Sequence, residues 1–302
     1  MLSQIIQLML QQSSVVAGYL LTFIVVGAFA VYPSVAPVGL ASGCSPFGFV
    51  LATMLVALAG TLTLGIFRRS PVVPSSSQVR GRVLLGTLFF LEHACLLFAL
   101  THLQVPVAMS LIYVYPFIIG VVGVVTGAYS PSLILFGSLL LCLLGITLVL
   151  GFAPEQVSSL GIVFALTQAV LAASRIMLAS RLARAADGLA LTIQMLIVGV
   201  SLAVITAPLV SITFPSDLIG WFAILAAGMS GMVGHTCLIW ALQRIGAVPF
   251  GVIMNLEPIV AALLAALIAG QILTRTQYAG ALLVVAAVCW YGIAERKKYQ
   301  VT

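Results

Sequence analysis

The chain has 302 residues, of which 63% are hydrophobic and 6% are charged, and its formal net charge is +6. A soluble domain carries roughly 25% charged residues, so a chain this poor in charge cannot cover a water-facing surface. The composition excludes a soluble enzyme and indicates a protein whose solvent is the lipid bilayer.

Glycine, proline, serine and charged residues divide the chain into apolar stretches of about 20 residues, the length of a membrane-spanning helix. We predict ten such helices, at 15–35, 44–66, 83–101, 104–125, 132–152, 159–179, 189–212, 218–242, 248–270 and 276–294. Residues 2–12 are interpreted as a short interfacial lead-in, because no cleavable signal peptide is evident. The polar stretch 68–82 predicts a surface loop. The expected fold is an all-α polytopic membrane protein.

Basic residues predict the orientation of these helices. With ten spans both termini share one side, and placing them in the cytoplasm puts ten lysines and arginines inside and only Arg275 outside. This distribution is a positive-inside signal, so the basic excess sets topology and does not indicate a nucleic-acid partner. We place Arg175 in the inward last turn of its helix, with its side chain reaching toward the cytoplasmic surface; the alternative role is binding of a substrate carboxylate. The prediction is a multi-pass protein of the cytoplasmic (inner) membrane.

An internal repeat runs through the chain, with an offset of 142 residues that becomes 143 after one inserted residue. Among the matching pairs, His93 with His235 is the most informative, because the chain has three histidines. The same offset pairs Gly86 with Gly228, Cys95 with Cys237, Leu96 with Leu238, Ala99 with Ala241, Leu100 with Leu242 and Pro116 with Pro258, and a single inserted residue then pairs Gly127 with Gly270 and Gly137 with Gly280. We predict repeats at 1–152 and 153–302. Five helices in each make the second repeat inverted, which predicts a substrate site near the midplane and transport by alternating access.

The same stretches resemble the EamA family of the drug/metabolite transporter superfamily. In the first half the resemblance rests on Phe98-Ala99-Leu100, Tyr113-Val114-Tyr115-Pro116, Gly127 and Gly137. In the second half it rests on Trp240-Ala241-Leu242, Gly246-Ala247, Leu256-Glu257-Pro258, Gly270 and Gly280. The resemblance implies a cytoplasmic-membrane exporter of amino acids and other small metabolites. Where the family often has Gly-Glu, this chain has Gly127-Ala128 and Gly270-Gln271, so it lacks those two carboxylates.

Glu92 is the candidate proton-coupling residue. A charged acid at the centre of a membrane helix costs about 2.5–3.5 kcal/mol on insertion scales, so its side chain must face protein or a water-filled cavity, or be protonated. The alternative role is a protonated acid that hydrogen-bonds a neighbouring helix.

Six residues are candidates for substrate binding. His93 and His235 occupy equivalent repeat positions, so pseudo-symmetry could bring them to one cavity, although each could equally serve as an interhelical hydrogen-bonding group. The others are Asn255, Glu257, Tyr113 and Tyr115. The two tyrosines lie about 200° apart around a helix, which predicts that only one of them faces the centre. Glu257 could bind substrate or form structural hydrogen bonds.

Pro116 and Pro258 are the predicted helix breaks. A proline cannot donate to the carbonyl four residues earlier, and a freed carbonyl at this depth must find a partner or line a cavity.

Absent motifs narrow the function further. No phosphate-binding loop or His-Glu-x-x-His is present, and the five cysteines form no Cys-x-x-Cys pair, so we predict no cofactor and no metal. The leading hypothesis is a secondary transporter, functional as a monomer, that exports amino acids or amine-bearing compounds. The alternatives are an intramembrane lipid-modifying enzyme, and a passive channel or assembly subunit.

Overall fold

A computed structural model describes residues 2–70, 79–151, 158–269 and 273–301, with side chains for 13–70, 79–151, 158–268 and 273–295. Within these ranges the chain is helical, and ten segments are long and apolar enough to span a membrane. This confirms the expected all-α polytopic fold. The helices are α1 (Leu2–Ala41), α2 (Pro46–Arg68), α3 (Val79–His102), α4 (Val105–Ile112), α5 (Tyr115–Val125), α6 (Leu133–Leu150), α7 (Ser159–Ala183), α8 (Gly188–Thr206), α9 (Leu218–Ile245), α10 (Ala247–Met254), α11 (Glu257–Ala269) and α12 (Arg275–Val301), with a 3-10 turn, η2, at Ala207–Leu209.

The first helix is longer than predicted. It continues past the expected end at residue 35, through Pro33 and Pro37, and ends at Ala41. Prolines are tolerated in membrane helices where neighbouring helices supply new partners. Here α9 and α11 both pack against α1, and the Ser34 hydroxyl donates to the Ala261 carbonyl of α11 at 3.2 Å.

Two of the ten spans are broken near their centres, at equivalent positions of the two repeats. The fourth span stops at Ile112 and restarts at Tyr115, and the ninth stops at Met254 and restarts at Glu257. Pro116 and Pro258 are each the second residue of the restarted helix. A proline fits there because the first helical N–H groups have no intrahelical acceptor. Both breaks leave polar backbone in the interior of the bundle.

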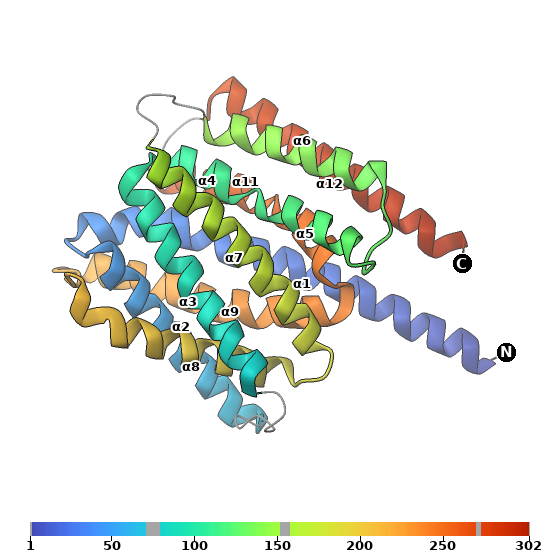
Figure 1. The fold of residues 1–302 in the computed structure, drawn as a ribbon, viewed down its shortest axis with the longest axis horizontal. Coiled ribbons are helices and arrows are strands. Elements are labelled where there is room, and N and C mark those ends of the chain that lie inside the picture. Colours follow the sequence, from blue (N-terminus) through green and yellow to red (C-terminus); the bar gives the residue numbers. More distant parts are fainter. Residues whose placement is uncertain (1, 71–78, 152–157, 270–272, 302) are drawn as a thin grey trace.

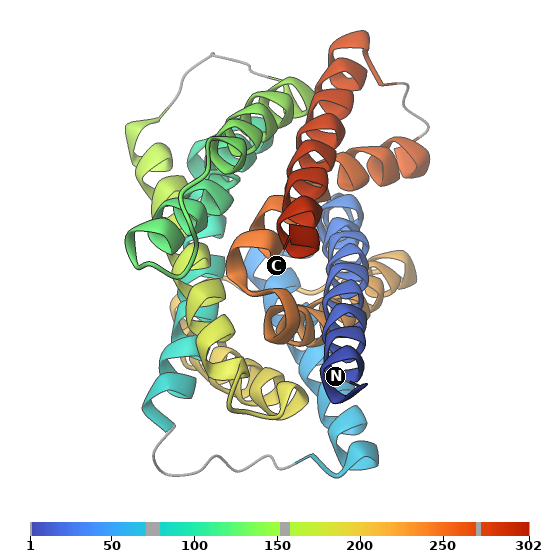
Figure 2. The same cartoon turned by 90° about the vertical axis from the view of Figure 1, so that its right-hand side faces the viewer.

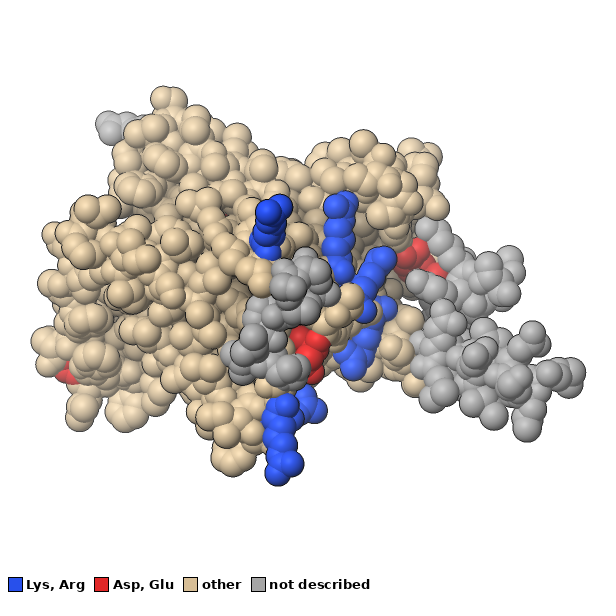
Figure 3. Space-filling view, turned by 60° about the horizontal axis from the view of Figure 1, so that its bottom comes forward, with Lys and Arg blue, Asp and Glu red and all other residues tan. Residues whose placement is uncertain are grey.

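One end of the molecule carries most of the described arginines. The C-terminal ends of α7 and α9 meet there, where the Gln243 side chain donates to the Ala183 carbonyl at 2.9 Å. The C-terminal end of α2 joins them, with the Arg68 guanidinium 5.1 Å from the centre of the Trp240 ring. We call this the arginine end; basic side chains gather on the face in Figure 3. The N-terminal end of α1 and the C-terminal end of α12 project from one common side of the molecule in Figures 1 and 2.

Contacts at the two ends of the molecule follow the sequence repeat. Gly18 of α1 lies against Arg244 and Ile245 at the end of α9, and Gly161 of α7 lies against His102 and Leu103 at the end of α3. The two contacts are therefore equivalent, because α1 and α7 open the two repeats and α3 and α9 are the third helix of each. Since α3 begins at the arginine end and α9 finishes there, α1 and α7 run in opposite directions.

A network of hydrogen bonds joins the α1–α2 turn to residues 213–216 at the end opposite the arginines. The Ser45 amide donates to the Thr213 carbonyl at 3.1 Å, and the Thr213 amide donates to the Ser45 hydroxyl at 3.1 Å. The Ser216 amide donates to the Ser42 carbonyl at 2.9 Å. This Ser45–Thr213 clamp holds the far ends of α1, α2 and α9 together.

Candidate functional site

A cavity of about 340 Å³ lies between the two broken spans and helices α1, α3, α7 and α9. Its mouth is apolar and includes Pro37 and Leu40 of α1, Leu100 of α3 and Val105 of α4. These residues place the mouth at the end opposite the arginines. Polar side chains gather at mid-span, namely Tyr32, Glu92, His93, Tyr113, Tyr115, Gln168, Arg175, Ser230, His235 and Glu257.

Glu92 and Arg175 form an ion pair across α3 and α7. The Arg175 Nε lies 2.8 Å from the Glu92 Oε1, and the two side chains are only 5% and 6% exposed. The expectation that Arg175 reaches the cytoplasmic surface is therefore wrong. The helix extends to Ala183, so Arg175 lies two turns from its end, too deep to reach water along the bilayer normal. Glu92 lines the cavity as expected, but its neighbour is a permanent cation.

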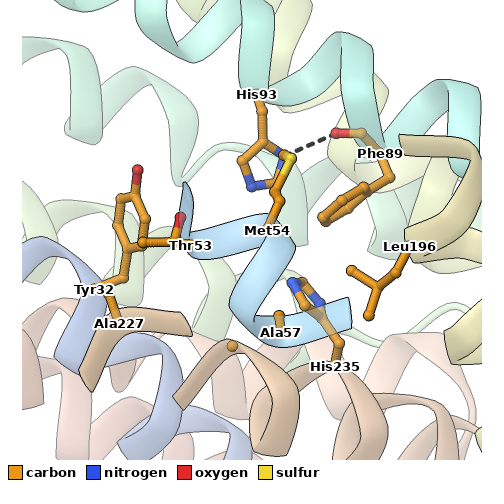
Figure 4. A pocket seen from close by; sticks show the side chains of 10 residues that line it. Tyr32, Thr53, Met54, Ala57, Phe89, His93, Leu196, Ala227 and His235 are labelled. Atoms are coloured by element: carbon orange, nitrogen blue, oxygen red, sulfur yellow. Dashed lines mark hydrogen bonds between the residues drawn. The ribbon is translucent and has the colours of Figure 1, made fainter. Parts of the chain in front are cut away.

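His93 and His235 lie on either side of the Phe89 ring (Figure 4), with centroid distances of 4.5 Å and 5.0 Å. The structure thus brings the two repeat-equivalent histidines to one place. His93 Nδ1 lies 2.7 Å from the Phe89 carbonyl. A carbonyl only accepts, so Nδ1 carries the proton and, in the neutral ring, Nε2 is left as an acceptor.

Tyr113 and Tyr115 both line the cavity, with ring centroids 6.1 Å apart. The prediction that only one of them faces the centre is wrong. It assumed a continuous helix, whereas α4 ends before Tyr113 and α5 begins at Tyr115. Tyr113 donates a hydrogen bond to Glu257 from the other broken span, which links the two breaks through their side chains.

Asn255 lies outside the cavity lining. Its amide donates to the carbonyls of Gly251 at 3.2 Å and Val252 at 3.0 Å. The side chain is 1% exposed. It therefore satisfies two carbonyls at the end of α10.

Sequence reasoning missed three polar lining residues, Tyr32, Gln168 and Ser230. Each is a lone polar residue in an apolar run, which is common in helical bundles. A signal existed for Tyr32, because the offset that pairs Gly127 with Gly270 also pairs Tyr32 with Arg175. Tyr32 thus occupies the position in the first half that Arg175 occupies in the second. No group of three metal-ligating side chains occurs within the described ranges.

Ten membrane spans, inverted helix directions and a polar cavity at two broken helices together define a transporter-like architecture. Residues 159–293 match the model of the EamA-like transporter family. The second half of the chain matches that family, which supports a membrane transporter of the drug/metabolite type. The resemblance of the first half stays a prediction.

Two further comparisons concern the whole chain. A solved crystal structure aligns with a TM-score of 0.78 and 18% identity, over 94% of this chain and 99% of the other. Identity this low demonstrates a common fold only. The comparison with curated proteins gave no match.

Proposed function

We propose that the protein is a secondary transporter that exports small organic metabolites, amino acids or amine-bearing compounds, by alternating access. The observation that carries this proposal is a central polar cavity that is open at one end while the equivalent passage at the other end is closed. A channel would need both passages open together, and a lipid-modifying enzyme would need a reactive group at the membrane edge.

The two passages differ in the exposure of equivalent residues. At the mouth, Leu40 is 41% exposed and Leu100 is half-buried. Their counterparts near the arginine end are Ala183 and Leu242, and each is 1% exposed. Pseudo-symmetry supports a second state in which these exposures are exchanged.

We assign the arginine end to the cytoplasm by the positive-inside rule. In this assignment the cavity faces outward, and substrate released from it leaves the cell. A reporter fused after Thr302 is expected to be active only inside, and one inserted in 213–217 only outside. Activity of both reporters on the same side would contradict the assignment.

Proton coupling is proposed for Glu92, with Glu257 as the alternative. Protonating Glu92 would leave the buried Arg175 guanidinium without its counter-ion, which is strongly unfavourable. Proton uptake at Glu92 therefore requires Arg175 to find another anion at the same time. Glu257 receives a hydrogen bond from Tyr113 and is suited to hold a substrate ammonium.

Paired cysteine variants test alternating access. In a background without the five native cysteines, Leu100→Cys and Leu242→Cys are probed with a small membrane-impermeant thiol reagent from either side. Leu100→Cys is expected to react from outside and Leu242→Cys from inside, with a saturating substrate shifting the two rates in opposite directions. Simultaneous reaction of both at unchanged rates would indicate a channel.

Transport by the purified protein in liposomes is the direct test. We expect saturable counterflow of a substrate found by screening amino acids and amines, with accumulation that follows an imposed proton gradient. Glu92→Gln is expected to retain counterflow and lose gradient-driven accumulation. Full accumulation by this variant would contradict the assignment of Glu92.

A further inference from the structure

The Arg175 guanidinium is incompletely paired. A guanidinium has five N–H donors, and the ion pair with Glu92 uses the Nε edge. Nη1 is buried and has no hydrogen-bond acceptor among the described residues. The guanidinium carbon lies 5.9 Å from the centre of the Phe89 ring, so an aromatic face supports the group while part of its donor edge stays unused.

Three acceptor-capable atoms of other residues that line the cavity also lack a hydrogen-bond partner within the described ranges. Glu92 Oε2, Gln168 Oε1 and His235 Nδ1 are buried and have no hydrogen-bond partner within the described part of the chain. All three side chains line the cavity. Buried polar groups are normally paired, so unpaired ones around a cavity indicate a ligand with an acceptor for the Arg175 guanidinium and donors for the three acceptor atoms.

The charges around the cavity restrict that ligand. Arg175 is the one lysine or arginine among the described lining residues, and Glu92 and Glu257 are the two carboxylates. A dianion would meet one cation and two acids, so it is disfavoured. One carboxylate matches the guanidinium fork in geometry and charge.

The remaining lining indicates the body of the ligand. Beyond the polar centre the walls are aliphatic, formed toward the mouth by Pro37, Leu40, Leu100, Val105 and Met109. A small apolar group attached to the carboxylate would occupy this part of the cavity.

We infer that Arg175 binds the single carboxylate of a small substrate with an apolar body. Glu92 stays paired with the Arg175 guanidinium until that carboxylate replaces it. The inference rests on the proposed transport function for its biological role. When the substrate carboxylate binds Arg175, Glu92 is released from its counter-ion. It can then take up a proton or receive a substrate ammonium.

The test uses isovalerate, which has one carboxylate and a branched apolar body, and its uncharged amide, isovaleramide. Binding is measured as the shift of the thermal unfolding midpoint of purified protein in detergent, without any gradient. Glu92→Gln removes the competing carboxylate, so its isovalerate dissociation constant is expected to be at least about tenfold lower than that of the wild type. Isovaleramide should shift neither protein.

The matched control is the double variant Glu92→Gln/Arg175→Gln, which has no buried charge at this position and should not respond to isovalerate. If Glu92→Gln does not fold, the wild type carries the comparison, with isovalerate expected to stabilise it more than isovaleramide does. Equal shifts by the two compounds, or an undiminished isovalerate shift in the double variant, would overturn the inference and leave a structural ion pair. A carboxylate-specific shift in a protein that fails to transport would instead refute the proposed function alone.

Discussion

The side of the bundle formed by α3, α7 and α8 and the side formed by α9, α1 and α2 share their packing but differ in their charges. Gly86 of α3 lies against Val198 and the Met195 carbonyl, and Gly228 of α9 lies in the same way against Val56 and the Thr53 carbonyl. At the equivalent positions of the repeat, however, Glu92 corresponds to Gly234 and Arg175 corresponds to Tyr32. The ion pair therefore exists on one side only.

This difference separates two kinds of constraint. Close helix contacts are set by the backbone path, so a duplicated path requires small residues at both equivalent positions. Charged side chains that bind a substrate follow a different rule. The substrate is not symmetric, so each of its charged groups needs one partner, and that partner need not be repeated in the other half. The comparison predicts that substitutions at paired glycines have equal effects, whereas substitutions at Arg175 and Tyr32 do not.

Breaking the ion pair should have the largest effect. Arg175→Gln leaves the Glu92 carboxylate buried and unpaired, which should cost about 3–5 kcal/mol. The counterpart change Tyr32→Phe removes no charge and is expected to cost much less. Thermal unfolding in detergent measures both, and Glu92→Gln/Arg175→Gln should recover most of the loss. A larger loss of stability for Tyr32→Phe than for Arg175→Gln would contradict the expected difference between the two sides.

Replacement of the paired glycines should have intermediate and equal effects. A Cβ at Gly86 would lie 2.4 Å from the Val198 Cβ, and one at Gly228 would lie 2.5 Å from the Val56 Cβ. Gly86→Ala and Gly228→Ala should each cost about 1–3 kcal/mol through overpacking. The control is Gly27→Ala, where nothing lies within 4 Å, and no destabilisation is expected. Unequal losses at the two glycines would show that the packing is not duplicated.

The sequence predicted the spans well because membrane helices need long apolar runs with polar ends. It also predicted that Glu92, His93 and His235 lie deep in the bundle. It could not predict the Glu92–Arg175 contact, since that depends on the rotation of α3 against α7. It likewise placed only one of Tyr113 and Tyr115 toward the centre, because periodicity assumes an unbroken helix.

Substitutions at the two breaks should give the smallest effects. Asn255→Ala removes two donors to the carbonyls at the end of α10 and should cost about 1–2 kcal/mol. Tyr113→Phe, at the equivalent position of the first repeat, removes one donor, to Glu257, so it should cost less than Asn255→Ala and weaken binding of amine-bearing probes through Glu257. Unfolding and probe titration on the same samples separate the effects. Similar stability losses for both variants would mean that the two breaks are held in the same way.

The Ser45–Thr213 clamp also has a pharmacological consequence. Because it ties the far ends of α1, α2 and α9 together, the clamp fixes one lip of the cavity mouth. In the proposed alternating-access cycle the other lip, carrying Leu100 and Val105, would be the side that closes. A compound that rests on the fixed lip and wedges against α4 would arrest the transport cycle without reaching Arg175. Its potency would be insensitive to substrate concentration, which makes the mouth a separate target for non-competitive inhibitors.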